Sequence, residues 1–104
     1  MLSILIPCYN YPTYDLVNVL YKQCIDLKIS FEILVSEDGG EAYVKDNKKI
    51  DSLDDCQYLI NQTNVGRAGN LNRLLKVSKY RLKLILDCDV WPKTSQFVDF
   101  YLNQ

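Results

Sequence analysis

The segment LKLILDCD at residues 82–89 decides how this chain is interpreted, because a strand-length apolar run leads directly into two carboxylates. Three similar runs precede it, at residues 2–6, 31–35 and 56–60, and each is followed by a proline or by polar residues. All but the third are nearly continuously apolar rather than alternating. This pattern is typical of strands that are covered on both faces, as in a parallel sheet.

Segments with helical character separate the four runs. Residues 14–27 place apolar side chains at spacings of three and four, and Thr13 precedes them as the predicted N-cap. Further helices are predicted over 71–78 and 94–102, whereas 41–55 is polar and predicts a short helix plus a loop. The order predicts an α/β fold, a Rossmann-like open and mostly parallel sheet of about four strands with helices on both faces.

The composition is that of one globular domain, which we expect to span residues 1–104. Hydrophobic residues make up 48% and charged residues 24%, and a net charge of −1 offers no basic face for nucleic acid. The chain has no histidine, which excludes catalytic triads, general bases and metal sites that depend on an imidazole. Any metal must therefore be held by carboxylates or thiolates, and carboxylates favour magnesium or manganese.

The four cysteines, Cys8, Cys24, Cys56 and Cys88, are scattered and form no C-x-x-C pair. Their spacing argues against a disulfide framework or a zinc knuckle and favours a reducing cytoplasm. Cys8, Cys56 and Cys88 lie in or beside apolar runs, so we interpret them as small hydrophobes rather than reactive groups. No stretch reaches the roughly 20 apolar residues of a membrane helix, and the apolar start lacks the pattern of a signal peptide.

Ligands in open parallel sheets bind beyond the carboxyl ends of the strands, so residues just after each run are candidates. Asp87 and Asp89 follow the fourth run, and on an extended backbone residues i and i+2 point to the same side. Both carboxylates can then face one divalent ion, which offsets their mutual repulsion. The alternative interpretation, a solvated turn, stands on equal terms.

Other strand ends carry groups that suit a nucleotide. Asp38, in the segment EDGG, can accept hydrogen bonds from a ribose hydroxyl or a pyrimidine N–H, although a plain turn is the simpler alternative. Arg67 lies where NVGRAG opens a helix and would attract phosphate, unless it is only a solvated helix start. The segment is not a P-loop. Tyr9 can stack on a planar base and Trp91 can wall the same pocket, unless both rings simply pack.

Taken together, these segments resemble the nucleotide-sugar-binding half of a family 2 glycosyltransferase with the GT-A fold. The likeness covers Leu2 to about Trp91 and is specific because its parts stand in the correct order, each at a strand end. It is carried by LSILIPCYN (2–10), EILVSEDGG (32–40), NVG (64–66), Asn72 and LILDCD (84–89).

The resemblance implies transfer of a sugar, with inversion, from a nucleotide-diphosphate donor, usually UDP-linked. A saccharide or lipid-linked acceptor, as in polysaccharide biosynthesis, would receive it. It implies that Pro7 and Tyr9 contact the base, that Asp38 hydrogen-bonds the uracil, and that Asp87 lies at the nucleotide. Asp87 and Asp89 match the D-x-D motif, whose second carboxylate holds Mn²⁺ or Mg²⁺ against the diphosphate, where the metal acts as Lewis acid.

The chain departs from the family pattern in three respects. Glu37 replaces the usual Asp, and Leu71 stands where Arg often precedes Asn72, so Arg67 is the substitute neighbour of the diphosphate or base. The family's catalytic base and acceptor-binding part come later than Gln104, and inversion needs that base. We therefore expect a truncated piece that binds donor but does not catalyse transfer alone.

The sequence bears unequally on the alternatives to this interpretation. A noncatalytic nucleotide-binding α/β module stays open, as does peripheral membrane association of the full enzyme. A phosphate-accepting receiver domain is disfavoured because no acid cluster follows the first run. A nucleotidyltransferase is disfavoured because no G-x-G-x-R loop stands there.

Overall fold

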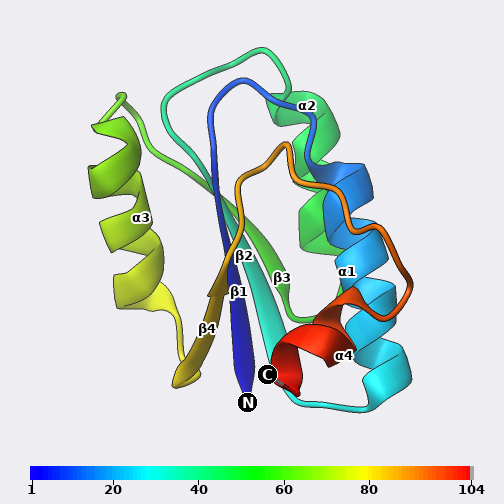
Figure 1. Ribbon diagram of the computed structural model, residues 1–104. Helices are drawn as coiled ribbons and strands as arrows, with labels where there is room; N and C mark the ends of the chain where they lie inside the picture. Colours follow the sequence, from blue (N-terminus) through cyan, green and yellow to red (C-terminus); the bar gives the residue numbers. More distant parts are fainter. Residues whose placement is uncertain (104) are drawn as a thin grey trace.

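Four parallel strands form the centre of the molecule, and helices cover both faces of the sheet (Figure 1). The computed structural model describes residues 1–103. Its elements are, in chain order, β1 (Leu2–Cys8), α1 (Tyr14–Leu27), β2 (Phe31–Glu37), α2 (Val44–Asn47), the 3₁₀ helix η1 (Lys48–Ser52), β3 (Cys56–Ile60), α3 (Gly66–Val77), β4 (Leu82–Ile85) and α4 (Phe97–Leu102).

The strand order is β3-β2-β1-β4, and every neighbouring pair is parallel. This confirms the predicted α/β sheet. The two central strands, β1 and β2, are buried along their whole length, as their continuous apolar runs indicated. Within residues 1–103, α3 is the one helix on the first face of the sheet, and α1, α2 and α4 lie on the other face (Figure 1).

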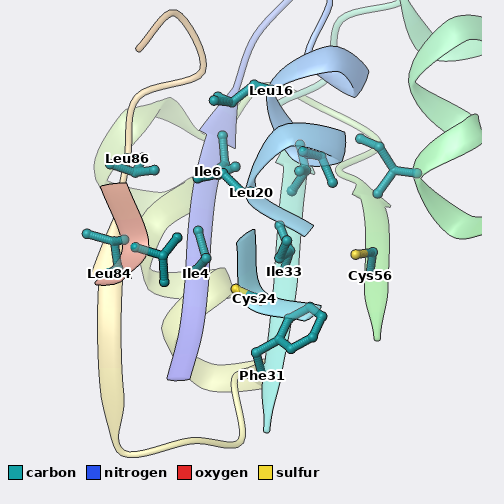
Figure 2. Packing of buried hydrophobic residues seen from close by; sticks show 14 of the residues in the cluster. Ile4, Ile6, Leu16, Leu20, Cys24, Phe31, Ile33, Cys56, Leu84 and Leu86 are labelled. Carbon is teal, nitrogen blue, oxygen red and sulfur yellow. The ribbon is translucent and has the colours of Figure 1, made fainter. Parts of the chain in front are cut away.

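The core is divided unequally between the two faces of the sheet. On the α1 face, alternate strand residues such as Ile4, Ile6 and Ile33 pack with Leu16 and Leu20 of the helix (Figure 2). The opposite face has a much smaller cluster, made by Leu5, Leu34 and Leu74 with Leu59 packed against them. Helix α3 is therefore docked by few apolar side chains.

Strand β1 extends further than the sequence indicated. It continues through Pro7, which pairs with Ser36 of β2, and ends at Cys8. The pairing of β1 with β4 stops at Leu5, whose carbonyl accepts the N–H of Leu86 at 3.0 Å. Pro7 has the same orientation as Leu5, so its missing N–H falls where no β4 partner is present.

Several helix boundaries also differ from the predicted ones. Helix α3 begins at Gly66, within the turn NVGRAG that was expected to open a helix and before the apolar residues at 71–78, and α4 begins only at Phe97. Thr13 is the N-cap of α1 through its carbonyl, which accepts the N–H of Val17 at 3.1 Å. Its hydroxyl does not cap the helix but donates to the Tyr11 carbonyl at 3.1 Å. Within residues 1–103, no helix has the length and apolar character needed to cross a bilayer.

Candidate functional site

A cleft of about 570 Å³ lies at the carboxyl end of the sheet. The chain runs from β1 outward to β3, then crosses through α3 to place β4 on the other side of β1. The order therefore reverses between β1 and β4, and a crevice forms where loops leave the two strands in opposite directions. The cleft is lined by Pro7, Cys8, Tyr9, Tyr11, Asp38, Asn64, Gly66, Arg67, Asn70, Asp87, Cys88 and Asp89.

This one cleft contains all six residues that the sequence singled out as donor or metal contacts. They are Pro7, Tyr9, Asp38, Arg67, Asp87 and Asp89. They converge because parallel strands end at the same edge of a sheet and α3 begins there. Trp91 does not join them: it lines a neighbouring hollow with Tyr11 and Asp15, and its side chain is exposed. The expectation that Trp91 walls the same pocket is not met.

Asp38 is buried at the floor of the site, and its carboxylate ties two loops together. Its Oδ1 accepts the backbone N–H of Val65 at 2.8 Å and the amide of Asn61 at 3.0 Å. Both bonds use the same oxygen, which leaves Oδ2 outside these contacts while the residue borders the cleft. A buried carboxylate held in this way has a fixed orientation and a second oxygen to offer a ligand.

A chain of amides extends from Asp38 into the interior. Asn61 donates to Asn70 Oδ1 at 3.0 Å, and Asn70 donates to the Ser36 carbonyl at 2.8 Å. The Arg73 guanidinium donates to the side-chain carbonyl of Asn61. The sequence analysis assigned no role to Asn61, Asn70 or Arg73. The available signal was an asparagine at the polar end of a strand and another asparagine within an otherwise amphipathic helix. Through them, α3 is positioned against β2 beside the cleft.

Asp87 forms an ion pair with Arg67 at the cleft, and the distance from Asp87 Oδ1 to Arg67 Nη2 is 2.7 Å. Both side chains are more than half exposed, at 62% for Arg67 and 55% for Asp87. An exposed ion pair of this kind contributes roughly 0–1 kcal/mol. A phosphate or a metal ion can therefore compete for either partner at little energetic cost.

The argument that Asp87 and Asp89 share one side of an extended strand is corrected by the structure. Strand β4 ends at Ile85, and the segment then turns, with the N–H of Val90 donating to the Asp87 carbonyl at 3.1 Å. The two acids follow a turn rather than a strand because the pairing with β1 has already ended. Both still line the cleft.

The donor set of the cleft suits a metal that is shared with a phosphate ligand. Within residues 1–103, no three acid or cysteine side chains gather closely enough to hold an ion by themselves. Mg²⁺ needs only one or two carboxylates when water and phosphate oxygens complete its shell. Asp87 and Asp89 provide two exposed carboxylates at one rim, so these residues fit such an ion.

Glu37 holds the loop that carries Tyr9. Its fully buried carboxylate accepts the N–H of Asn10 at 3.1 Å and the N–H of Gly40 at 3.3 Å through Oε2. Its Oε1 accepts the hydroxyl of Tyr58 at 3.3 Å. The ring of Tyr9 is left 56% exposed at the cleft. An acid at the end of an otherwise buried strand was the sequence signal for this role.

Two cysteines also border the cleft. Cys88 is partly exposed, whereas Cys8 is buried. Interaction with the Cys8 thiol lowers the pKa of Cys88 to about 7, and the same contact, together with burial, raises the pKa of Cys8. Cys8 and Cys56 are buried in the core, as expected of small hydrophobes, and Cys24 is buried with them; Cys88 is partly buried and packs against the same core.

The chain is therefore an open parallel α/β protein with a cleft at the switch point of its sheet, between β1 and β4. A family model described as "Glycosyl transferase family 2" matches residues 3–100, and the chain belongs to that family. A comparison with curated proteins finds no matching sequence.

Solved glycosyltransferase structures share the fold. S. aureus TarS 1-349 superposes with a TM-score of 0.78 at 21% identity, over 98% of this chain and 31% of that one. The same protein in complex with UDP-GlcNAc gives a TM-score of 0.78 at 21% identity, and the match covers 98% of this chain and 30% of that one. The mannosyltransferase PcManGT from Pyrobaculum calidifontis, in complex with GDP-Man and Mn²⁺, gives a TM-score of 0.72 at 17% identity. That match covers 91% of this chain and 29% of the mannosyltransferase chain. The present chain spans less than a third of each.

Proposed function

We propose that residues 1–104 bind the donor of an inverting glycosyltransferase, and that the donor is a nucleotide-diphosphate sugar linked to UDP. The observation that carries this proposal is that six residues from the end of β1, from the segments after β1, β2 and β4, and from the start of α3 line one cleft. The fold is shared with TarS in complex with UDP-GlcNAc and with a mannosyltransferase in complex with GDP-Man and Mn²⁺, which supports a nucleotide-sugar ligand.

We assign the nucleotide base of the donor to the side of the cleft formed by β1 and β2. The exposed ring of Tyr9 stacks on the pyrimidine, and Pro7 gives the strand end a rigid approach to it. Asp38 accepts the ring N–H through its second oxygen, since Oδ1 is already committed to the loop at Val65. Because Asp38 is held by Asn61 as well, it is preorganised before ligand binds.

The diphosphate is assigned to the side formed by β4 and α3. Asp87 and Asp89 would hold Mn²⁺ or Mg²⁺, which supplies the positive charge that stabilises the departing nucleotide diphosphate. Arg67 exchanges Asp87 for a phosphate oxygen, an exchange that the weak exposed pair permits. The N-terminus of α3, where Arg67 lies, also favours a negative ligand.

The acids that line the cleft are all assigned to the donor. Asp38 serves the base, and Asp87 and Asp89 serve the metal, so no carboxylate that lines the cleft within residues 1–103 is left to deprotonate an acceptor hydroxyl. We therefore propose that this chain binds donor without transferring sugar, and that a saccharide or lipid-linked acceptor binds the whole enzyme. Four free thiols favour the cytoplasm as its compartment.

Calorimetric titration with UDP tests the proposal. We expect binding in Mn²⁺ or Mg²⁺, affinity weaker by roughly tenfold or more in excess chelator, and loss of that metal dependence in Asp89→Ala. Asp26→Asn, on the exposed surface of α1, is the matched control and should leave the metal dependence intact. Tight UDP binding in chelator that Asp89→Ala does not alter would overturn the assignment.

A noncatalytic nucleotide-binding module would give the same titrations. Sugar transfer from the donor by a chain extended at its C-terminus separates the two functions. Turnover by the present chain alone would contradict the proposed commitment of the cleft acids.

A further inference from the structure

The net charge of −1 conceals an uneven distribution of charge along the chain. Residues 56–86 contain no Asp or Glu, although they hold half of the 12 Lys and Arg residues. Two of these cations, Arg67 and Arg73, belong to the cleft and to the amide chain behind Asp38. The other four lie close together in the sequence, within residues 76–83, which we name the basic turn. They are Lys76, Lys79, Arg81 and Lys83.

The basic turn lies at the amino edge of the sheet, at the opposite end of the strands from the cleft (Figure 1). It comprises the end of α3, the connection to β4 and the first residues of that strand. Lys76, Lys79 and Arg81 are exposed. The ammonium of Lys83 donates to Ser78 Oγ at 2.7 Å and to the Tyr80 carbonyl, so its charge also lies at this turn.

Within residues 1–103, no acid forms an ion pair with the basic turn. The ion pairs of this part of the chain join Lys49 to Asp46 and Arg67 to Asp87. Glu32 contacts the turn from inside the fold and is only 7% exposed. Its Oε2 accepts the N–H of Lys79 at 2.7 Å and the hydroxyl of Ser3 at 2.6 Å. These contacts hold the turn in place from the interior, so its cations form a positioned cluster.

The acids of the same edge lie at its far end. Asp54 and Asp55 precede β3, and the strand order β3-β2-β1-β4 puts three strand spacings between β3 and β4. At about 4.8 Å for each spacing, the separation is roughly 14 Å. This exceeds the screening length of about 8 Å at physiological ionic strength. The acids at β3 therefore do little to offset the positive charge at β4.

Exposed apolar side chains accompany the cations. Val77 is 51% exposed and Leu82 is 42% exposed. A membrane with anionic lipids attracts clustered Lys and Arg and accepts neighbouring apolar side chains into its interface. A single-stranded nucleic acid would instead use free aromatic rings for base stacking. Tyr80, the ring of this turn, is half-buried and has the Lys79 ammonium 5.2 Å from its centroid. The combination favours lipid over nucleic acid.

We propose that the basic turn binds the surface of a membrane that contains anionic phospholipids. Its cations lie against the lipid phosphates, and Val77 and Leu82 enter between the headgroups. Because the cleft opens at the other edge of the sheet, a nucleotide can bind while the turn is docked. The proposal concerns a different surface from the donor cleft and does not depend on the proposed function.

Cosedimentation with vesicles tests the proposal. We expect the chain to bind vesicles of phosphatidylcholine and phosphatidylglycerol in equal parts but not phosphatidylcholine alone, and we expect added salt to weaken binding. The variant Lys76→Gln/Lys79→Gln/Arg81→Gln loses three cations, each contributing roughly fivefold, so binding should fall by roughly a hundredfold. The control Lys22→Gln/Lys45→Gln/Lys48→Gln has the same net charge, changes exposed lysines of α1, α2 and η1, and should bind like the wild type.

Equal losses in the two triple variants would overturn the proposal, because net charge alone would then explain the binding. Binding to polyglutamate or to poly-adenylate RNA as tight as to the vesicles would overturn the assignment to lipid. Val77→Ser should weaken vesicle binding at unchanged net charge, and unchanged binding would overturn the insertion of apolar side chains. Circular dichroism confirms folding of each variant. UDP affinity should be equal in the wild type and the first triple variant, and a wild type that binds vesicles but no UDP would contradict only the proposed function.

Discussion

Leu74 is the residue on which the docking of α3 depends. It is fully buried and is the only residue of α3 in the small cluster with Leu5 and Leu34. The other buried residue of the helix, Asn70, is polar and contributes hydrogen bonds instead. Since the first turn of α3 carries Arg67 at the cleft, Leu74→Ala should loosen both the fold and the site.

The magnitude follows from what the substitution removes. Leu→Ala deletes three carbon groups, and at roughly 0.8 kcal/mol each their burial contributes about 2.4 kcal/mol. The substitution also leaves a cavity, and the few neighbouring side chains can close it only in part. The expected loss in the free energy of unfolding therefore rises to about 3 kcal/mol, within the measured range for buried Leu→Ala changes. The total free energy of unfolding of a domain of this size is roughly 5–15 kcal/mol. The variant should still fold, with a much smaller margin.

Urea unfolding followed by circular dichroism measures this loss. Leu75→Ala is the matched control, since Leu75 is the next residue of the same helix and is 37% exposed; its free energy of unfolding should fall by less than about 1 kcal/mol. Equal losses in the two variants, or a loss below about 1 kcal/mol for Leu74→Ala, would show that α3 is not held in the way described. UDP affinity should fall only in Leu74→Ala.

Two further predictions concern charge and pH. Arg67→Ala removes the exposed pair with Asp87, so the free energy of unfolding should change by less than about 1 kcal/mol while UDP affinity falls; a large loss of stability without a change in affinity would contradict the proposed role. Burial raises the pKa of Cys24 and of Cys56 from 9.0 to about 12. The unfolded chain therefore loses these protons first, and stability should fall as pH rises from 9 toward 12. Urea midpoints measured across this interval should decline less steeply in Cys24→Ala/Cys56→Ala than in the wild type.

The central strands β1 and β2 were predictable because their burial is recorded directly in composition, whereas β4, whose run is as continuously apolar, is an edge strand with Leu82 and Ile85 each 42% exposed. A strand covered on both faces needs apolar residues throughout, and β1 and β2 are buried at every position. The start of α3 was predicted from the glycine-bearing turn NVGRAG at residues 64–69 and not from apolar periodicity. Its first residues, Gly66 to Ala68, are exposed at the cleft, so no apolar period marks them.

The topology of the sheet made it predictable that the candidate residues lie close together. Parallel strands all end at one edge, so polar residues after separate runs must approach one another there. The contacts among them were not predictable. Asn70 reaches the carbonyl of Ser36 across 34 residues, and Arg67 reaches Asp87 from another loop, and no periodicity encodes such pairings.

Glu37 shows how a departure from the family pattern is accommodated by its surroundings. One carboxylate oxygen binds the N–H groups of both Asn10 and Gly40, so the side chain must reach from β2 to two loops. A Cβ added at Gly40 would overlap the side chains of Asn10 and Glu37, so a larger residue there would displace both groups from this contact. An Asp at position 37 would have to draw these loops closer by about the length of one methylene group. The longer acid is therefore matched to the loop that carries Tyr9.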